Sequence, residues 1–435
     1  MSDQFQQDII KKIDDIKDER NIFQTGRVIR IRDYIIEAEG LEDVCFFEKV
    51  VIGNNTFGYI NEIKENSVLI SLVHQEEPVY VNDVVRATGE VLTASFSNDS
   101  VGHVVDIFGK DLMTGNYFET AEKVPIESPV TPIMDRTAVN RPMLTGIAGI
   151  DMLYPIGRGQ RQLIIGDKKT GKTQIALDAI VNQRGSKTLC IYVAVGKTKK
   201  NVKEVYEELL KHGAMSYTVI LAAFNNEKPP VLSLTPFVAL SIAKQMMEIG
   251  IDVLVVIDDL KRQADVYREI ALLSGKDPGR DAYPADIFYV HARMLEQGCQ
   301  HKSGGSITIL PIMETRGGDI TDYIATNVIS ITDGQIVMSK ENFDKGQKPA
   351  INYGLSVSRL GGAVQTKDMK KLGARIRREL LSYLETRDIY ELVNMDEMGQ
   401  ELRDALLQGK GLLKKFNQGK FQLRSLEEMI ETFDK

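Results

Sequence analysis

The segment from Gly166 to Thr173 constrains this chain more than any other stretch of its sequence. It reads Gly-Asp-Lys-Lys-Thr-Gly-Lys-Thr and fits the pattern G-x-x-x-x-G-K-[ST] in full. An apolar stretch, LIIG, leads into it, and an apolar helical stretch, TQIALDAIV, follows it. This order of strand, glycine-rich loop and helix is the context of a phosphate-binding loop, so the sequence predicts one here in preference to an ordinary glycine turn.

The pattern assigns chemistry to the residues of this loop. Its glycines let backbone N–H groups close around phosphate oxygens, and the following helix directs its positive end toward them. We expect Lys172 to reach the β- and γ-phosphates and the hydroxyl of Thr173 to ligate magnesium. The predicted nucleotide-binding residues of the loop are Gly166, Asp167, Lys168, Lys169, Thr170, Gly171, Lys172 and Thr173.

An acidic strand end lies further along the chain, with Asp258 placed 85 residues after Thr173. The stretch LVVIDD, residues 254–259, is an apolar strand candidate that ends in two carboxylates. In a nucleotide-binding sheet such an acid orients magnesium, usually through water, so Asp258 is the second predicted metal residue. Because buried strands often end in acidic turns, the phosphate loop is what favours this interpretation.

Residue patterning predicts four parts. Isoleucines at helical spacing open the chain, and short β-branched runs broken by Gly and Asn then predict a small antiparallel β-barrel. Apolar strands alternating with helical stretches predict an α/β core of the RecA-like P-loop type, with a mostly parallel sheet. The charged end of the chain reads as helical. The predicted parts are an N-terminal helix (1–22), a β-barrel domain (23–92), a nucleotide-binding P-loop domain (93–368) and a C-terminal helical domain (369–435).

Individual elements of the later parts are also predicted. Residues 233–250 carry the apolar pattern of a crossover helix, and Gly409, Gly411 and Gly419 are expected to separate two or three C-terminal helices. The strand candidates of the core are QLIIG (162–166), TLCIYVAV (188–195), YTVILAAF (217–224), DVLVVIDD (252–259), ITILPIM (307–313) and NVISIT (327–332).

Composition narrows the classes of protein. The chain has 435 residues, too many for one compact core, and its formal net charge of -7 argues mildly against a free nucleic-acid binder. Its cysteines, Cys45, Cys190 and Cys299, are few and far apart, so we expect buried thiols in a reducing cytoplasm rather than disulfides or a zinc site. No apolar run of roughly 18 residues and no signal peptide is apparent, so no membrane span is predicted.

Four segments resemble the alpha subunit of the F-type ATP synthase head. They are residues 141–185 (from RPMLTGIAGIDMLYPIGRGQ), 258–296 (from DDLKRQADVYREIALLSGKDPGRDAYPADI), 321–336 (TDYIATNVISITDGQI) and 348–372 (KPAINYGLSVSRLGGAVQTKDMKKL). The likeness continues from about Gly26 to Asp434. The spelling G-D-x-x-T-G-K-T is typical of alpha subunits, whereas the catalytic beta subunits of that family have a more glycine-rich loop.

The resemblance implies partners and a place in the cell. Three alpha-type and three beta-type chains would alternate in a ring around a rotating central stalk, with peripheral-stalk or membrane-sector proteins attached. ATP or ADP with Mg²⁺ would bind between chains, where beta-type sites turn nucleotide over and alpha-type sites only hold it. The complex would be a proton-translocating-type ATP synthase or ATPase, cytoplasmic and peripheral to the inner face of the cell membrane. Neither a nucleic-acid partner nor direct membrane insertion is expected.

Two further residues bear on the subunit type. In the family, the arginine matching Arg359, within SVSRLGG, reaches in trans to the γ-phosphate of the neighbouring beta site; from the sequence alone a structural salt bridge is the alternative. Lys197, within YVAVGKT, stands where catalytic beta subunits carry Glu and alpha subunits usually carry Gln. An ammonium cannot accept a proton from water, so this site is expected to be nearly inert, unless Lys197 merely faces solvent.

The chain departs from the alpha pattern near the predicted adenine pocket. Lys348 stands before Pro349 where the family usually has Arg, and Gln418 matches an adenine-contacting Gln, whereas Lys420 replaces a second one. The loop LEQGCQHKSGGS is shorter than usual, and the family's chains normally continue beyond the position of Lys435 as further helix, so the helical domain is truncated relative to them. The base-binding role of Lys348, Pro349 and Gln418 is therefore expected on the resemblance alone.

Four alternatives stay open at this point. One is a self-sufficient hexameric ATPase of the export type, against which Lys197 argues because those enzymes carry the catalytic Glu. A second is a synthase-like ATPase that powers a motor other than synthesis, such as gliding. A third is a hexameric RNA motor, but residues 1–90 lack the basic and aromatic composition it would need. The last is a regulatory nucleotide-binding scaffold.

Overall fold

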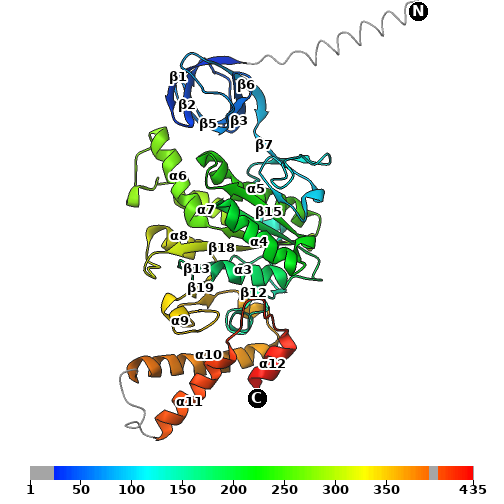
Figure 1. Ribbon diagram of the computed structural model, residues 1–435, viewed down its shortest axis with the longest axis vertical. Helices are drawn as coiled ribbons and strands as arrows, with labels where there is room; N and C mark the ends of the chain where they lie inside the picture. The colour runs from blue at the N-terminus through cyan, green and yellow to red at the C-terminus, as the bar shows by residue number, and fades with distance from the viewer. Residues whose placement is uncertain (1–23, 391–399, 435) are drawn as a thin grey trace, which may run out of the picture. The chain divides into compact units, whose positions relative to one another are not determined.

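The computed structural model describes residues 24–390 and 400–434, and the helix predicted over residues 1–22 lies outside them (Figure 1). The chain divides into two compact units. One contains the chain up to Thr93 together with Lys228–Val231 and Tyr267–Asp277, and the other contains the remaining residues. Each unit is described by itself below.

The first unit is built on a closed antiparallel barrel with the strand order β1-β2-β5-β4-β3-β6 (Figure 1). Its strands alternate buried and exposed residues, most clearly in β1, because successive side chains of a strand point to opposite faces. The interior is filled by apolar side chains such as Val28, Ile36, Ile60, Ile70 and Val85, none of which has exposed surface. The predicted barrel is thus confirmed. Its strands are β1 (Thr25–Arg32), β2 (Ile35–Glu39), β3 (Glu48–Ile52), β4 (Thr56–Ile63), β5 (Val68–His74) and β6 (Val84–Val91).

The second unit contains a sheet whose main path runs β20-β19-β13-β18-β16-β14-β15-β8. All pairs from β19 to β8 along this path are parallel, and β20 adds an antiparallel edge. The central strands are buried over nearly their whole length, as expected for a parallel sheet covered on both faces. The strands are β8 (Val104–Val105), β13 (Leu163–Asp167), β14 (Thr188–Lys197), β15 (Thr218–Phe224), β16 (Asp252–Asp258), β18 (Ser306–Thr315), β19 (Gly334–Met338) and β20 (Val357–Ser358).

Helices alternate with these strands along the chain, which confirms the predicted α/β core. The crossover helix expected over residues 233–250 is α5, which begins slightly earlier and covers Pro229–Glu248. The other helices of the core are α2 (Ala148–Asp151), α3 (Lys172–Val181), α4 (Lys199–Lys211), α6 (Leu260–Ser274), α7 (Ile287–Leu295), α8 (Tyr323–Ile331) and α9 (Lys340–Asp344). Short strands pair outside the main path: β7 (Thr93–Phe96) with β9 (Glu122–Pro125), β10 (Arg136–Thr137) with β17 (Cys299–His301), and β11 (Pro142–Met143) with β12 (Ile156–Gly157).

One strand prediction was wrong. Residues 327–332 (NVISIT) lie mostly in helix α8, and the strand of this region is β19, immediately after it. Their β-branched residues favour a strand by local propensity, but Ile324, Ala325 and Val328 form one buried helical face. The segment is helical because burial of that face outweighs the strand propensity of its residues.

Two observations bear on the expectations from composition. Helix α5 is long and apolar enough to cross a membrane by length and composition, but 83% of its apolar window is buried inside the structure. Cys190 and Cys299 are buried as expected, whereas Cys45 is exposed. Burial raises the pKa of the Cys190 thiol, so it is held as a neutral core group.

The C-terminal part is helical, as predicted, with α10 (Lys367–Tyr390), α11 (Gln400–Lys415) and α12 (Leu426–Asp434). Gly409 and Gly411 do not separate helices, since both lie inside α11, and only Gly419 falls between α11 and α12. A Cβ on Gly409 would lie 2.3 Å from ring atoms of Tyr383 in α10. This glycine therefore permits the close approach of α10 and α11 instead of ending a helix.

The buried centre of the parallel sheet predicts a strong sensitivity to truncation. Leu254 in β16 has no exposed surface, so Leu254→Ala should leave a cavity and lower the free energy of unfolding by about 2–5 kcal/mol. Leu210→Ala is the matched control, because Leu210 is 53% exposed, and it should change stability by no more than about 0.5 kcal/mol. Calorimetric melting of both variants checks this; equal effects would mean that β16 is not at the centre of the core.

Candidate functional site

The predicted phosphate loop lies where four parallel strands end. It follows β13, which pairs with β18 such that Gly166 is opposite Glu314. Strand β16 ends at Asp258 beside β18, and β14 runs along the other side of β16 and ends at Lys197. Ligands of open α/β sheets bind at the carboxyl ends of the strands, so this edge is the expected place for a nucleotide.

The loop between β13 and α3 has the conformation of a phosphate cradle. Gly171 is in the left-handed region with φ 98° and precedes α3 directly. The Thr170 hydroxyl donates to the backbone oxygen of Asp167 at 2.8 Å, and the ammonium of Lys172 donates to the same oxygen at 2.6 Å. Burial lowers the pKa of Lys172, because desolvation disfavours its charged form, although nearby acids oppose this. The loop thus has the strand–loop–helix context that the motif requires.

Two neighbouring segments fix the position of the loop. A Cβ on Gly166 would lie 2.4 Å from the backbone oxygen of Met338 in β19, so only glycine allows the two strands to approach this closely. The carboxylate oxygen Oδ1 of Asp167 accepts hydrogen bonds from the Thr315 hydroxyl and from the N–H of Gly318, both at 2.7 Å. The loop is therefore held from β19 and from the end of β18.

The carboxylate of Asp258 forms two hydrogen bonds and one ion pair. Its Oδ2 accepts from the hydroxyl of Thr173 at 2.8 Å and from the hydroxyl of Tyr192 at 2.7 Å. Its Oδ1 forms an ion pair with the ammonium of Lys197 at 2.6 Å. The side chain of Asp258 is only 2% exposed, so these contacts replace the water it would otherwise bind.

Lys197 does not face solvent, which was one interpretation of the sequence. Its side chain is 28% exposed and its ammonium contacts Asp258. Burial alone would lower the pKa of Lys197, but the charges of Asp258, Asp259 and Glu314 outweigh it and raise this pKa. The lysine is thus held in its charged form at the site.

The sequence assigned no role to two other acids at this edge. Asp259 accepts hydrogen bonds through Oδ1 from the N–H groups of Lys261 and Arg262, so it caps the start of α6, and burial raises its pKa to about 6. Glu314 is partly buried at the end of β18, where its charge acts on Lys172 and Lys197. Only the strand register, which is not visible in the sequence, shows that Glu314 lies opposite Gly166.

The residues present fit phosphates better than they fit magnesium. The backbone cradle and Lys172 match an anion. Of the two predicted metal residues, Asp258 is already paired with the ammonium of Lys197, whereas Thr173 donates its proton to Asp258 and keeps its oxygen lone pairs. In the described part of the chain, no group of three His, Cys, Asp or Glu side chains could hold a metal ion.

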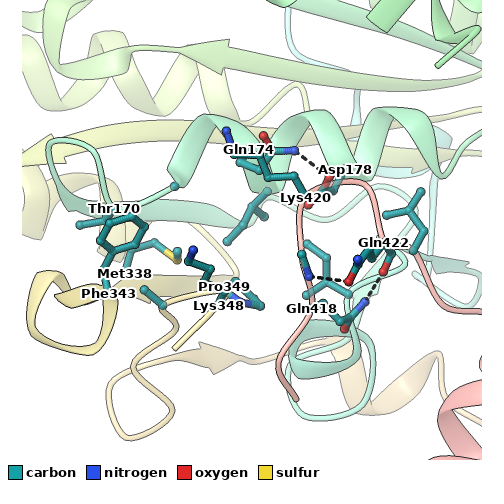
Figure 2. Close-up of a pocket in the computed structure, with 16 residues that line it drawn as sticks. Thr170, Gln174, Asp178, Met338, Phe343, Lys348, Pro349, Gln418, Lys420 and Gln422 are labelled. Carbon is teal, nitrogen blue, oxygen red and sulfur yellow. Dashed lines mark hydrogen bonds between the residues drawn. The ribbon is translucent and has the colours of Figure 1, made fainter. Parts of the chain in front are cut away.

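A cavity of about 310 Å³ extends from the phosphate loop. Thr170 and Gly171 line one side, and two segments distant in sequence, around Lys348 and around Gln418, line the others (Figure 2). The structure thus places Thr170 and Gly171 of the predicted loop around one space with the predicted base residues Lys348, Pro349 and Gln418, whereas Lys172, Thr173 and Asp258 do not line it. Residues of the lining that sequence reasoning missed are Ile147, Gln174, Ile175, Asp178, Met338, Phe343, Ala350, Gly419, Gln422 and Leu423.

The side-chain amide of Gln418 forms hydrogen bonds within the protein. Its Oε1 accepts from the N–H of Ala148 at 2.7 Å, and its Nε2 donates to the backbone oxygens of Gly146 and Gln422. Gln418 is 7% exposed, and its own N–H donates to the backbone oxygen of Lys348 at 2.7 Å. This residue therefore joins the two segments of the cavity wall, while Lys348 is exposed.

Arg359 lies outside this cavity, directly after β20. It is exposed, and its guanidinium donates one long hydrogen bond, from Nη1 to the backbone oxygen of Thr332 at 3.4 Å. Its N–H anchors the backbone to the oxygen of Asp333 at 2.9 Å. A fixed backbone with an outward guanidinium is a suitable arrangement for contact with another molecule.

Fold and site together define a P-loop nucleotide-binding protein with a mostly parallel sheet. Residues 146–358 match the family model described as ATP synthase alpha/beta family, nucleotide-binding domain. The six-stranded barrel, the parallel core and the C-terminal helices match the fold of that family. The match supports a nucleotide-binding domain of the kind found in subunits of rotary-type ATPases, a family whose members form hexameric rings and bind ATP or ADP, usually with Mg²⁺. The match does not distinguish alpha from beta subunits.

The phosphate cradle predicts that removal of Lys172 weakens nucleotide binding. Lys172→Ala removes the cation expected to contact the β- and γ-phosphates, and a charge-assisted hydrogen bond contributes about 1.5–3 kcal/mol, so affinity for ADP should fall about 10- to 100-fold. Titration calorimetry of the purified chain measures this. Lys203→Ala is the control, because that side chain is 75% exposed on α4 and pairs with Glu207 on the same helix. Equal affinities of wild type and Lys172→Ala for ADP would show that the loop is not part of the binding site.

Proposed function

We propose that this chain is an alpha-type subunit of an F-type rotary ATPase head, which binds ATP or ADP without turning it over. The observation that carries the proposal is the ion pair between Lys197 and Asp258. Hydrolysis requires a group that orients or deprotonates the attacking water, and a carboxylate or amide usually does so. At the position where beta subunits carry that carboxylate, this chain holds an ammonium, which has no lone pair to accept a proton.

Two of the surrounding acids are engaged in other contacts. Asp258 is bound by three partners, and Asp259 accepts hydrogen bonds from the start of α6. The ammonium would stabilise bound nucleotide in its ground state, and such binding energy does not raise kcat. A site that binds nucleotide and retains it is the function these contacts favour.

The second part of the proposal concerns Arg359. We infer that it acts in trans as an arginine finger at the site of a beta-type neighbour. A planar guanidinium donates to the transferring phosphoryl group as charge spreads over its oxygens, and such fingers contribute about 10³–10⁵ in rate. Its exposure and the lack of an ion pair within the part of the chain that the structure describes support this over a structural salt bridge.

The proposal includes the assembly expected from the resemblance. Three chains of this kind and three beta-type chains would form the ring, with a central stalk and peripheral-stalk or membrane-sector partners, at the inner face of the cell membrane. Proton-coupled ATP synthesis and a synthase-like ATPase that drives another motor, such as gliding, are both compatible with this site. An export-type ATPase that hydrolyses ATP by itself is disfavoured by Lys197.

The trans role of Arg359 is tested in the assembled ring. Arg359→Ala should lower ATP hydrolysis about 10³-fold or more while the ring stays intact and this chain keeps its own nucleotide, because a finger acts mainly on the transition state. Arg359→Lys should also lower ATP hydrolysis, since a point-like ammonium does not reproduce the planar fork of the guanidinium. Steady-state hydrolysis and bound-nucleotide analysis measure both effects.

The matched control for that test is Arg86→Ala, which removes another exposed arginine, on the barrel. It should leave hydrolysis unchanged. Full activity of Arg359→Ala, or loss of this chain's own nucleotide in that variant, would contradict the finger.

Assembly gives an independent prediction. Co-expression with a beta-type chain should yield a particle of three plus three subunits by native mass spectrometry, because the chemistry requires Arg359 to meet a second kind of site. A homohexamer of this chain with full ATPase activity would exclude the alpha-type role.

A further inference from the structure

The ion pair of Lys197 also bears on the metal of this site. Strand β14 is irregular at its end: its register against β15 shifts between Val195 and Lys197, and Gly196 between them has φ 64°. A left-handed glycine at such a bulge re-aims the next side chain. Here it places the ammonium of Lys197 at 2.6 Å from Oδ1 of Asp258, within the sheet edge that carries the phosphate loop.

In P-loop sites magnesium performs two electrostatic tasks. It neutralises the acid at the end of the neighbouring strand, and it bridges the phosphate oxygens to the protein. Without a cation, the buried charge of Asp258 would repel the phosphates, and at short range in a partly dry site this repulsion is large. Lys197 already performs the first task, since both oxygens of Asp258 have donors and one of these is a full positive charge.

An ammonium can perform the second task as well. It has three N–H donors, and one of them is directed to Asp258. The side chain remains 28% exposed, which leaves the other donors accessible from the site. A magnesium ion placed beside Asp258 would instead add two positive charges next to the ammonium of Lys197.

We propose that Lys197 acts as a built-in cation in place of magnesium, so that this chain binds nucleotide independently of divalent metal. Phosphate groups would be held by the backbone cradle, Lys172 and Lys197 together. The inference rests on the proposed function in one respect, namely that nucleotide binds at this loop. It concerns the metal, not turnover, so either can fail without the other.

The test uses the full chain and a fluorescent methylanthraniloyl-ADP probe, titrated in Mg²⁺ and in EDTA. Wild type should bind with affinities that agree within about threefold in the two buffers. Lys197→Gln should need the metal, and its affinity should fall about tenfold or more in EDTA, the range expected for loss of one charge-assisted contact. Lys200→Gln is the matched control, because Lys200 is 85% exposed on the same helix that follows Lys197, and it should behave as wild type.

A second readout follows the metal itself, and its wild-type measurement does not depend on the variant folding. Electron paramagnetic resonance of Mn²⁺ should show no tightly bound ion in the wild-type chain saturated with ADP, whereas Lys197→Gln should acquire about one Mn²⁺ per chain. Stoichiometric Mn²⁺ on wild type, a tenfold loss of wild-type affinity in EDTA, or absence of nucleotide binding in both buffers would each overturn the inference. If the chain binds nucleotide without metal and also hydrolyses ATP, the inference about Lys197 stands and only the non-catalytic role is refuted.

Discussion

A buried carboxylate that must be neutralised organises this molecule. Asp258 ends a strand at the centre of a parallel sheet, its side chain is 2% exposed, and an unpaired charge there would cost several kcal/mol. Its charge is stabilised by hydrogen bonds from Thr173 in α3 and Tyr192 in β14 and by an ion pair with Lys197 at the end of β14. The contacts that satisfy Asp258 also fix the beginning of the phosphate-loop helix and the end of β14, so the stability of the core and the chemistry of the site depend on the same group.

That arrangement separates the tasks of binding and turnover. The cradle from Gly166 to Lys172 supplies what a phosphate site needs, which is a glycine-rich turn at the start of α3 and the ammonium of Lys172, held here by the backbone oxygen of Asp167. The position that would activate water holds a cation instead. The exposed guanidinium of Arg359 lies on a different strand end, away from the cavity lining. A chain with these three features is suited to hold one nucleotide and to assist the chemistry of another site.

Much of this could be predicted from the sequence, because the decisive signals are local. The phosphate loop, the apolar strands and the barrel runs each depend on residues close together in the chain, and the structure places them as expected. Residues 327–332 were assigned wrongly because burial of one face of α8 outweighs β-propensity. The glycine at 409 was misread because its reason is a contact with Tyr383, which is distant in sequence. Likewise, the pairing of Lys197 with Asp258, the position of Glu314 and the internal bonds of Gln418 arise from tertiary contacts that no periodicity reveals.

The most direct measurement of the central claim is a single-turnover assay on the purified chain, with radiolabelled ATP mixed below the concentration of sites and quenched after minutes. The account predicts that bound ATP is recovered intact, because the group beside the γ-phosphate position is an ammonium. Conversion of most of the bound ATP to ADP and phosphate within those minutes would contradict it and would point to Glu314 as the group that activates water.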